Sequence, residues 1–227
     1  MKNRLLNLYA EHRGKPAYAR IVQANGGEVE ILLYGVISSD REEAMFFGGV
    51  SPEDLVSALN EAAGRPVRLR IHSPGGSAYG GLAMATAVSQ YPGEIVAQVD
   101  SIAASAASVV AVAAQRVEMP PWATIMIHKA WALVAANADG MLSAAAELER
   151  MDGQLAELYL GKTGLPMDQI MEMMRAETEM TAEQAISLGF ADVVLESKQR
   201  GDTGPANAAG IDAAQYLRRI ESLTIEV

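Results

Sequence analysis

Short apolar runs of strand type alternate with helical segments along most of the chain, and this alternation limits the fold more than any other feature of the sequence. In residues 66–72, for example, Val67, Leu69 and Ile71 alternate with two arginines, the period-two pattern of a half-buried strand. Strands are expected at 28–37, 66–72, 94–99, 116–119 and 124–127, and helices at 51–64, 79–89 and 101–114. Such an order predicts an α/β fold built of βαβ units.

The length of 227 residues predicts one domain with short appendages, and a composition that is 50% hydrophobic is sufficient for a sizeable core. We expect an N-terminal segment over 1–27, the main domain over 28–195, a polar linker over 196–210 and an amphipathic tail helix over 211–227.

Helix signals dominate the last third of the chain, whereas residues 41–50, with acidic side chains and a Gly pair, are expected to form a loop. Leu148, Met151, Leu155 and Leu158 recur every three or four residues, so this apolar stripe packs within the domain, against another subunit, or both.

Composition and charge exclude several function classes. The chain has no cysteine, which excludes disulfides and thiolate chemistry, and its three histidines leave little room for a metal site, so no cofactor is expected. A formal net charge of −10 argues against a nucleic-acid partner. The apolar run 102–114 is too short to span a bilayer and the N-terminus lacks signal-peptide features, so we expect a cytoplasmic protein with no membrane partner.

A glycine pair follows the strand predicted at 66–72. In Ser73-Pro74-Gly75-Gly76-Ser77, the two glycines leave backbone N–H groups uncovered by side chains. Such a turn can hold an anion, including a developing oxyanion, or can simply be a tight connection that needs positive φ.

A serine and a histidine are the candidate reactive pair. Ser105 lies among small residues at the start of the helix predicted over 101–114, where backbone amides favour negative charge, and His128 ends the strand predicted over 124–127. Imidazole is the natural general base for a serine, and a third, acidic group would fix its tautomer. The candidates for that group are Glu172, Glu177, Glu179 and Asp192, and spacing does not choose among them.

Four blocks in this order resemble the ClpP family of serine peptidases. They are Ser73-Pro74-Gly75-Gly76, Ala103-Ala104-Ser105, Met126-Ile127-His128, and Met180-Thr181-Ala182-Glu183-Gln184-Ala185 with Gly189-Phe190-Ala191-Asp192. The resemblance covers about residues 28–195 and is strongest to the ClpP-related head maturation (prohead) proteases of tailed bacteriophages, through Val99-Asp100 and Glu177-Thr178-Glu179. It implies a ClpP/crotonase-type spiral fold of repeated ββα units with a protruding long helix.

Carried over residue by residue, the resemblance implies that Ser105 is the nucleophile and His128 the base, with the backbone N–H groups of Gly76 and Ala106 as oxyanion donors. Glu177 stands where the family usually has the triad Asp, and Glu179 is its rival. His72 stands where relatives usually carry Asn, and a role in supporting the turn is favoured over catalysis.

The implied activity is hydrolysis of peptide bonds through an acyl-enzyme, in a homo-oligomeric ring that binds its polypeptide substrate as an added strand. The implied task is cleavage of scaffold or coat protein in phage head assembly. A degradative peptidase working with an ATPase is the nearer alternative, and the chain itself has no Gly-x-x-x-x-Gly-Lys motif.

Three rival interpretations remain at this point. A crotonase-like acyl-CoA binder shares the fold and does not need Ser105 and His128 together. A Ser–Lys dyad would use Lys129 as base, although in a strand Lys129 would point away from the side of His128. A non-catalytic assembly protein could retain a peptidase fold.

Overall fold

The computed structural model describes residues 10, 15, 17–25 and 27–196. The predictions for the tail helix, for most of the linker and for most of the N-terminal segment lie outside these residues.

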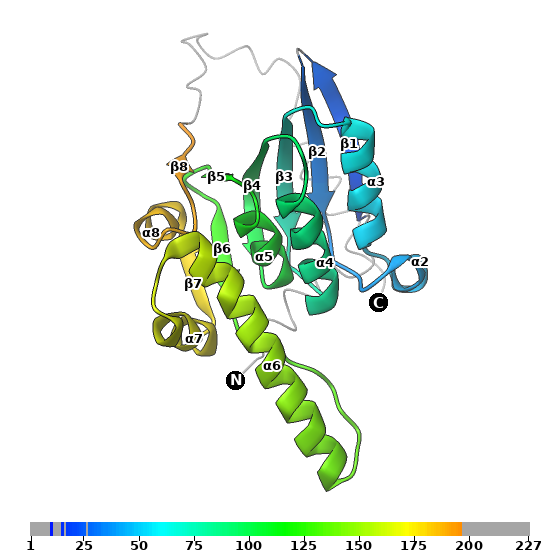
Figure 1. Ribbon diagram of the computed structural model, residues 1–227, viewed down its shortest axis with the longest axis vertical. Coiled ribbons are helices and arrows are strands. Elements are labelled where there is room, and N and C mark those ends of the chain that lie inside the picture. The colour runs from blue at the N-terminus through cyan, green and yellow to red at the C-terminus, as the bar shows by residue number, and fades with distance from the viewer. Residues whose placement is uncertain (1–9, 11–14, 16, 26, 197–227) are drawn as a thin grey trace, which may run out of the picture. The chain divides into compact units, whose positions relative to one another are not determined.

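An eight-stranded sheet organises the described part of the chain (Figure 1). Its strands are β1 (Tyr18–Asn25), β2 (Glu28–Tyr34), β3 (Val67–Ser73), β4 (Ile95–Ala104), β5 (Arg116–Met119), β6 (Thr124–Ile127), β7 (Thr178–Thr181) and β8 (Val193–Val194). The order is β1-β2-β3-β4-β5-β8, with β6 paired to β4 and to β7. Strands β2 to β5 are parallel, whereas β1 and β7 pair antiparallel with their neighbours. The predicted α/β class is confirmed.

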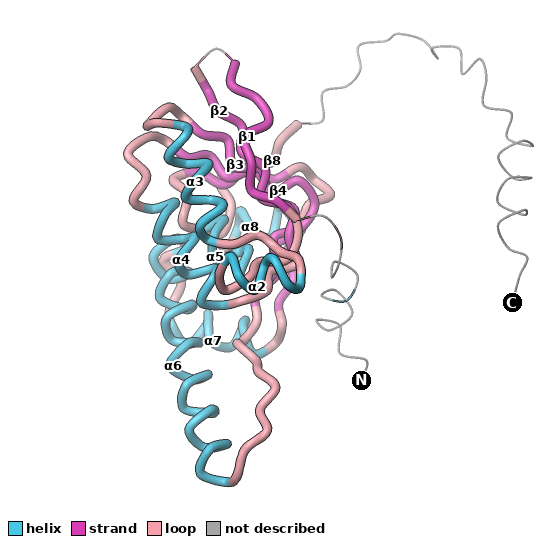
Figure 2. Tube along the Cα trace, turned by 90° about the vertical axis from the view of Figure 1, so that its right-hand side faces the viewer, coloured by secondary structure: helices cyan, strands magenta, loops and turns pink. Residues whose placement is uncertain are grey.

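The described residues form seven helices in addition to this sheet. They are α2 (Arg41–Phe47), α3 (Pro52–Ala62), α4 (Ala78–Ser89), α5 (Ala106–Val112), α6 (Ala138–Thr163), α7 (Met167–Arg175) and α8 (Ala182–Ser187). Figures 1 and 2 agree that α3, α4 and α5 cover one face of the sheet. No helix in the described ranges is both long and apolar enough to cross a membrane.

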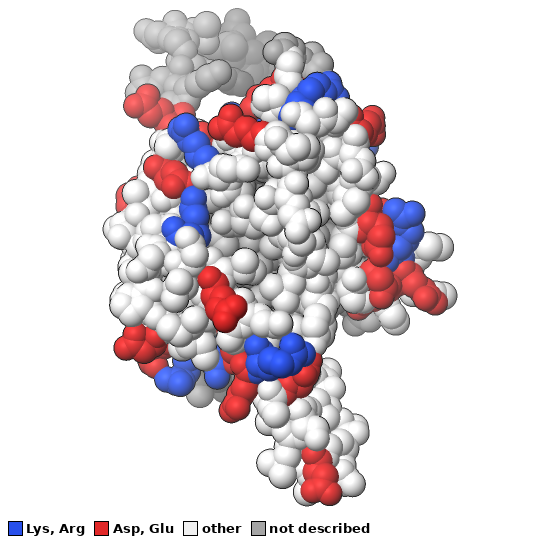
Figure 3. Space-filling model, viewed as in Figure 1, with Lys and Arg blue, Asp and Glu red and all other residues white. Residues whose placement is uncertain are grey.

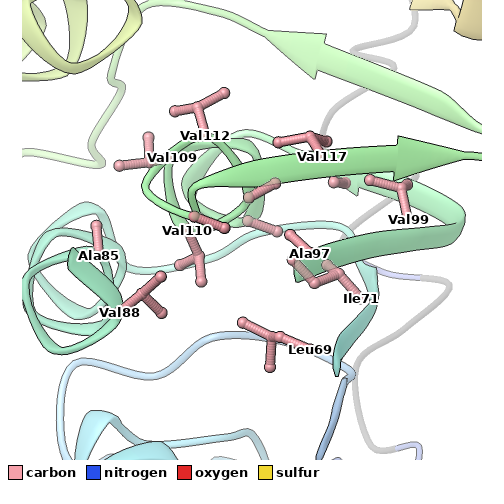
Figure 4. Close-up of a cluster of buried hydrophobic side chains, with 14 of the residues drawn as sticks. Leu69, Ile71, Ala85, Val88, Ala97, Val99, Val109, Val110, Val112 and Val117 are labelled. Atoms are coloured by element: carbon pink, nitrogen blue, oxygen red, sulfur yellow. The ribbon is translucent and has the colours of Figure 1, made fainter. Parts of the chain in front are cut away.

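The core lies between that sheet face and the helices that cover it. In β3 the residues Val67, Leu69 and Ile71 are fully buried while the alternate positions are half-buried, as the period-two pattern predicts. Figure 4 shows the cluster around Leu69, Ile71, Ala85, Val88, Ala97, Val99, Val109, Val110, Val112 and Val117. Each fully buried valine contributes about 1.5–3 kcal/mol by leaving water.

Ion pairs cover the opposite face of the sheet. Arg70 of β3 contacts Glu30 of β2 and Asp100 of β4, and Tyr34 donates a hydrogen bond to Asp100. Burial, followed by the hydrogen bond to Asp100, raises the pKa of Tyr34 to about 12. Arg68 contacts Glu28 and Glu118 in the same way. These charges are paired across strands, which keeps this face of the sheet polar.

Two of the secondary-structure predictions were wrong, one in the type of element and one in where a helix begins. Residues 41–50, expected to be a loop, contain helix α2, which Asp40 caps by accepting the Glu43 N–H at 2.9 Å. Helix α2 buries no residue, so it has no apolar periodicity to reveal it. The helix predicted over 101–114 begins only at Ala106, because Ile102–Ala104 continues β4 and pairs with β6. The structure also adds β1, which the polar composition of 1–27 did not suggest.

Helix α6 is the longest of the described helices, with 26 residues between the caps Asn137 and Gly164. Its buried residues, which include Met151 and Leu155 of the predicted stripe, lie in its C-terminal half. The N-terminal half projects beyond the sheet, together with the loop that precedes it (Figures 1 and 2). The surface of this projection carries few charges (Figure 3).

Candidate active site

Ser105 occupies the sharp junction between β4 and α5. Its backbone has φ 54° and ψ −128°, a conformation that non-glycine residues rarely adopt and that costs about 1–3 kcal/mol. Neighbouring hydrogen bonds hold it there: the Ser105 N–H donates to Met126 O at 2.8 Å, and the Ser105 carbonyl accepts from the Ser108 N–H at 2.9 Å. The turn lifts the serine side chain out of both the strand and the helix.

His128 follows β6 and meets Ser105 because β6 runs parallel to β4. Ala104 pairs with Met126, so the residues just past both strand ends are neighbours. The Nε2 atom of His128 lies 2.7 Å from Ser105 Oγ. The two residues that the sequence predicted as a reactive pair are therefore in hydrogen-bond contact.

The second ring nitrogen of His128 determines which way this hydrogen bond runs. Its Nδ1 lies 2.5 Å from the carbonyl oxygen of Lys129, which can only accept, so Nδ1 carries the proton. Nε2 is then free to accept the Ser105 O–H. Burial lowers the pKa of His128, against smaller raising effects of the Lys129 carbonyl and the charges of Glu177 and Asp152. A neutral imidazole is the form that a general base needs.

The Gly75–Gly76 turn packs directly against the nucleophile. Gly75 has φ 88°, and a Cβ there would lie 2.7 Å from Ser105 Cβ and 2.9 Å from Ala106 N. Gly76 has φ 145°, and its Cβ would lie 2.1 Å from Ile37 O. Both positions therefore require glycine. Within residues 27–196 we find no hydrogen bond donated by the N–H of Gly76 or of Ala106, the two predicted oxyanion donors.

The register of β6 and β7 separates the four candidate acids. Ile127 pairs with Thr178, so Glu177 is the next residue opposite His128, and its charge raises the His128 pKa. The structure places no hydrogen bond between these two side chains; the Lys129 carbonyl occupies Nδ1 instead. Glu177 is exposed and has φ 51°.

The other three acids have different surroundings. Glu179 lies opposite Met126 in the β6–β7 pair. It is therefore two residues further along the chain than Glu177, the residue opposite His128. Glu172 forms an exposed ion pair with Arg175. Asp192 accepts the Val117 N–H at 2.6 Å and pairs with Lys162 at 2.7 Å, which makes it a structural residue at β5 and β8.

His72 lies on β3 beside Tyr34, with ring centroids 5.4 Å apart in an edge-to-face arrangement, and its carbonyl accepts the Gly35 N–H at 3.0 Å. These contacts join His72 to the end of β2, and its role in supporting the turn after β3 stays a prediction.

Asp152 is a site residue that sequence reasoning missed. This buried carboxylate of α6 accepts the Ala130 N–H at 2.7 Å and pairs with Lys129 Nζ at 3.1 Å, immediately behind His128. An available signal was its position on the buried face of α6, three residues before Leu155. The ion pair also bears on the Ser–Lys dyad, because it holds Lys129 at Asp152 while Ser105 bonds to His128.

Metal chemistry has no visible site here: within the described ranges, no cluster of three or more His, Asp or Glu side chains is arranged to hold an ion.

Comparison with known proteins identifies the family. The family model described as Clp protease matches residues 31–198. The chain belongs to the Clp protease family. Clp protease relatives include the ATP-dependent Clp protease proteolytic subunit 3 of Rhodococcus jostii, 32% identical over 165 residues, covering 71% of this chain and 80% of the relative. The ATP-dependent Clp protease proteolytic subunit of Dehalococcoides mccartyi is 28% identical over 185 residues, covering 76% and 90%.

A solved structure supports the Clp protease fold. A ClpP1 mutant from Listeria monocytogenes superposes with a TM-score of 0.64 at 20% identity, covering 74% of this chain and 92% of that one. This structure confirms the predicted ClpP-type fold, and the family model with the curated relatives confirms the predicted ClpP family and the enzyme class of serine endopeptidase.

Proposed function

We propose that this protein cleaves polypeptides with Ser105 as nucleophile, His128 as general base and Glu177 as the acidic group that supports the base. The observation that carries the proposal is the 2.7 Å contact between Ser105 Oγ and His128 Nε2, in a family of serine peptidases. The strained Ser105 turn and the adjacent Gly75–Gly76 turn support it.

The proposed reaction has two halves. Ser105 Oγ attacks the scissile carbonyl carbon while His128 Nε2 takes the hydroxyl proton, and the carbonyl oxygen becomes an oxyanion. The N–H groups of Gly76 and Ala106 donate to it. The C–N bond then breaks, His128 gives its proton to the leaving amine, and an acyl-Ser105 ester remains. Water, deprotonated by His128, then attacks the ester carbonyl carbon. The bond from that carbon to Ser105 Oγ breaks, and His128 returns the proton to Oγ, which releases the acid and regenerates Ser105.

Glu177 contributes by charge in this scheme. His128 becomes an imidazolium in each half-reaction, and a carboxylate next to it stabilises that cation. Its opposite position across the β6–β7 pair supports this role over Glu179.

We further propose that copies of the chain assemble into a ring and that substrate binds as an added strand. Exposed apolar side chains on the loop and projecting half of α6 support self-association: Trp131, Leu133, Met141 and Leu142. Asp139 is the one charged residue between residues 131 and 146.

For the biological task, the motif resemblance supports cleavage of scaffold or coat protein in phage head maturation, in the host cytoplasm. The alternative, a degradative subunit that works with an ATPase, is supported by the names of its relatives, which are ATP-dependent proteolytic subunits. Digestion of a scaffold or coat protein by the purified chain alone supports the first. Digestion of an unfolded protein only with a Clp ATPase and ATP supports the second.

The catalytic proposal is tested by intact mass after incubation with a fluorophosphonate. One adduct per chain, absent from Ser105→Ala, is expected. A folded wild-type protein that gains no adduct would favour a non-catalytic assembly protein. Activity that survives Ser105→Ala would favour the crotonase-like interpretation.

A further inference from the structure

Two polar side chains are buried on the same face of α6, an otherwise apolar contact surface. Asp152 is 2% exposed and Tyr159 is 1% exposed. They lie about two helical turns apart, so the rigid helix fixes the distance between them. Each reaches one peptide unit of the active site.

Asp152 contacts the peptide unit that joins Lys129 to Ala130. The N–H of this unit donates to Asp152 Oδ1 at 2.7 Å, and its carbonyl accepts from His128 Nδ1 at 2.5 Å. Because the peptide group is planar, a carboxylate that holds its N–H also sets the direction of its carbonyl. Asp152 therefore reaches the catalytic base through one peptide. The preceding peptide, which joins His128 to Lys129, is held separately by the Lys129 N–H bond to Met174 O.

Tyr159 contacts the peptide unit that joins Ser105 to Ala106, through Ser108. The Ser108 hydroxyl donates to the Ser105 carbonyl at 2.6 Å and lies 2.8 Å from the Tyr159 hydroxyl, which must then be the donor. Burial raises the pKa of Tyr159, so the donor proton stays in place. The N–H of the same peptide belongs to Ala106, a proposed oxyanion donor.

We propose that Asp152 and Tyr159 are positioning residues: Asp152 orients the peptide that holds His128, and Tyr159 orients the peptide that presents the Ala106 N–H. The inference rests on the proposed peptidase function. It assigns α6 a role in positioning both the base and the oxyanion donor, since this one helix carries both Asp152 and Tyr159.

Substitutions of Asp152 and Tyr159 are expected to change kcat and the pH profile in different ways. Asp152→Ala frees the 129–130 peptide and lowers kcat about 10- to 100-fold with KM little changed, the size expected for a misplaced catalytic group. Asp152→Asn retains an acceptor for the Ala130 N–H and recovers most of this rate. It also removes a negative charge near His128, so the pKa of His128 falls.

The charged groups that act on His128 must be separated in this test. They are Glu177 on the turn before β7 and Asp152 on α6, with Lys129 paired to the latter. Asp152→Asn leaves the Lys129 ammonium unpaired, which lowers the His128 pKa in the same direction.

Tyr159→Phe removes a single hydroxyl from a packed ring. We expect kcat to fall about 10-fold with the acid limb of the pH profile unmoved, because the oxyanion donor is disturbed and the base is not.

Matched controls exist elsewhere in the chain. Asp192→Asn alters another carboxylate that accepts a backbone N–H and pairs with a lysine, and Tyr91→Phe removes another tyrosine hydroxyl that donates to a backbone carbonyl, at 2.8 Å. Both controls should keep kcat close to the wild-type value, because Asp192 contacts Val117 and Lys162 and the Tyr91 hydroxyl contacts Arg65, away from Ser105 and His128.

The experiment measures kcat, KM and fluorophosphonate labelling rate against pH for the full-length variants, with thermal unfolding to check folding and NMR titration of His128. Rates of folded Asp152→Ala and Tyr159→Phe that match the controls would overturn the inference. If Asp152→Ala does not fold, Asp152→Asn and Tyr159→Phe decide it.

A wild type that takes no label contradicts the proposed function. The NMR titration of His128 then decides the inference alone: an unchanged His128 pKa in Asp152→Asn overturns it.

Discussion

Ser105 Oγ and His128 Nε2 lie 2.7 Å apart because two parallel strands, β4 and β6, end side by side. The contact depends on backbone pairing and on a strained serine turn, and within the described residues His128 Nδ1 donates to the Lys129 carbonyl and to no side-chain carboxylate.

Removing the base is predicted to abolish turnover, and removing the neighbouring lysine is not. His128→Ala should lower kcat by about 10²–10⁴-fold or more, the usual contribution of general acid–base catalysis. Lys129→Ala should lower it much less, since Lys129 contacts Asp152 rather than Ser105. Peptidase assays on both variants check this, and the reverse order of losses would establish a Ser–Lys dyad.

The strain at Ser105 predicts a stability difference between two inactive variants. Glycine adopts φ 54° without a Cβ penalty, whereas alanine does not. Ser105→Gly should therefore unfold with a free energy about 1–2 kcal/mol higher than Ser105→Ala. Urea denaturation measures this difference. Equal stabilities would mean that the serine turn carries no strain.

The Gly75–Gly76 turn is predicted to tolerate no side chain. Gly75→Ala would place a Cβ 2.5 Å from Ala104 O, so the turn must shift away from Ser105. We expect a loss of at least about 100-fold in kcat/KM, as for displaced catalytic groups. Gly153→Ala in α6 is the control, because its Cβ meets nothing within 4 Å and helix propensity favours alanine. A fully active Gly75→Ala protein would contradict this geometry.

The acid limb of the pH–rate profile should lie below 6.5. Burial is the largest effect on the His128 pKa and lowers it, so the enzyme keeps its base neutral at mildly acidic pH. Glu177 raises this pKa, and Glu177→Gln should shift the limb further down and reduce kcat. The measurement is kcat/KM against pH. A limb that does not move would remove Glu177 from the triad.

The same depressed pKa predicts how stability changes with pH. At a pH between the pKa values of His128 in the folded and the unfolded chain, the unfolded chain binds a proton at His128 and the folded chain does not. The contribution of His128 to the free energy of unfolding is therefore complete above the unfolded value of about 6.5, and falls as pH drops through the folded value. Urea denaturation of the wild type and His128→Asn from pH 7.5 to 5 isolates this slope. Parallel curves would contradict it.

Assembly should depend on the projecting apolar surface. Leu133 and Leu142 are 91% and 70% exposed, so their replacement by Asp should not disturb the subunit core. We expect the double variant to have a smaller mass by light scattering than the wild type, while Val56→Asp on α3 retains the wild-type mass. An unchanged mass for the double variant would place the subunit contact elsewhere.

Two helix starts depend on local sequence alone. Ser51 with Asp54 and Thr181 with Gln184 both form capping boxes, because these depend only on residues three positions apart. The α2 helix escaped detection for the complementary reason, since it buries nothing and its apolar residues do not repeat along one face.

The sequence by itself determined the α/β alternation, the glycine turn, and the serine and histidine, because each is a local pattern or a family motif. Only the tertiary structure decided what surrounds His128. Strand register brought Glu177 opposite it, and the packing of α6 brought Asp152 behind it, from more than 20 residues away along the chain. Such contacts depend on which strands pair and which helix face is buried, and no local spacing encodes either.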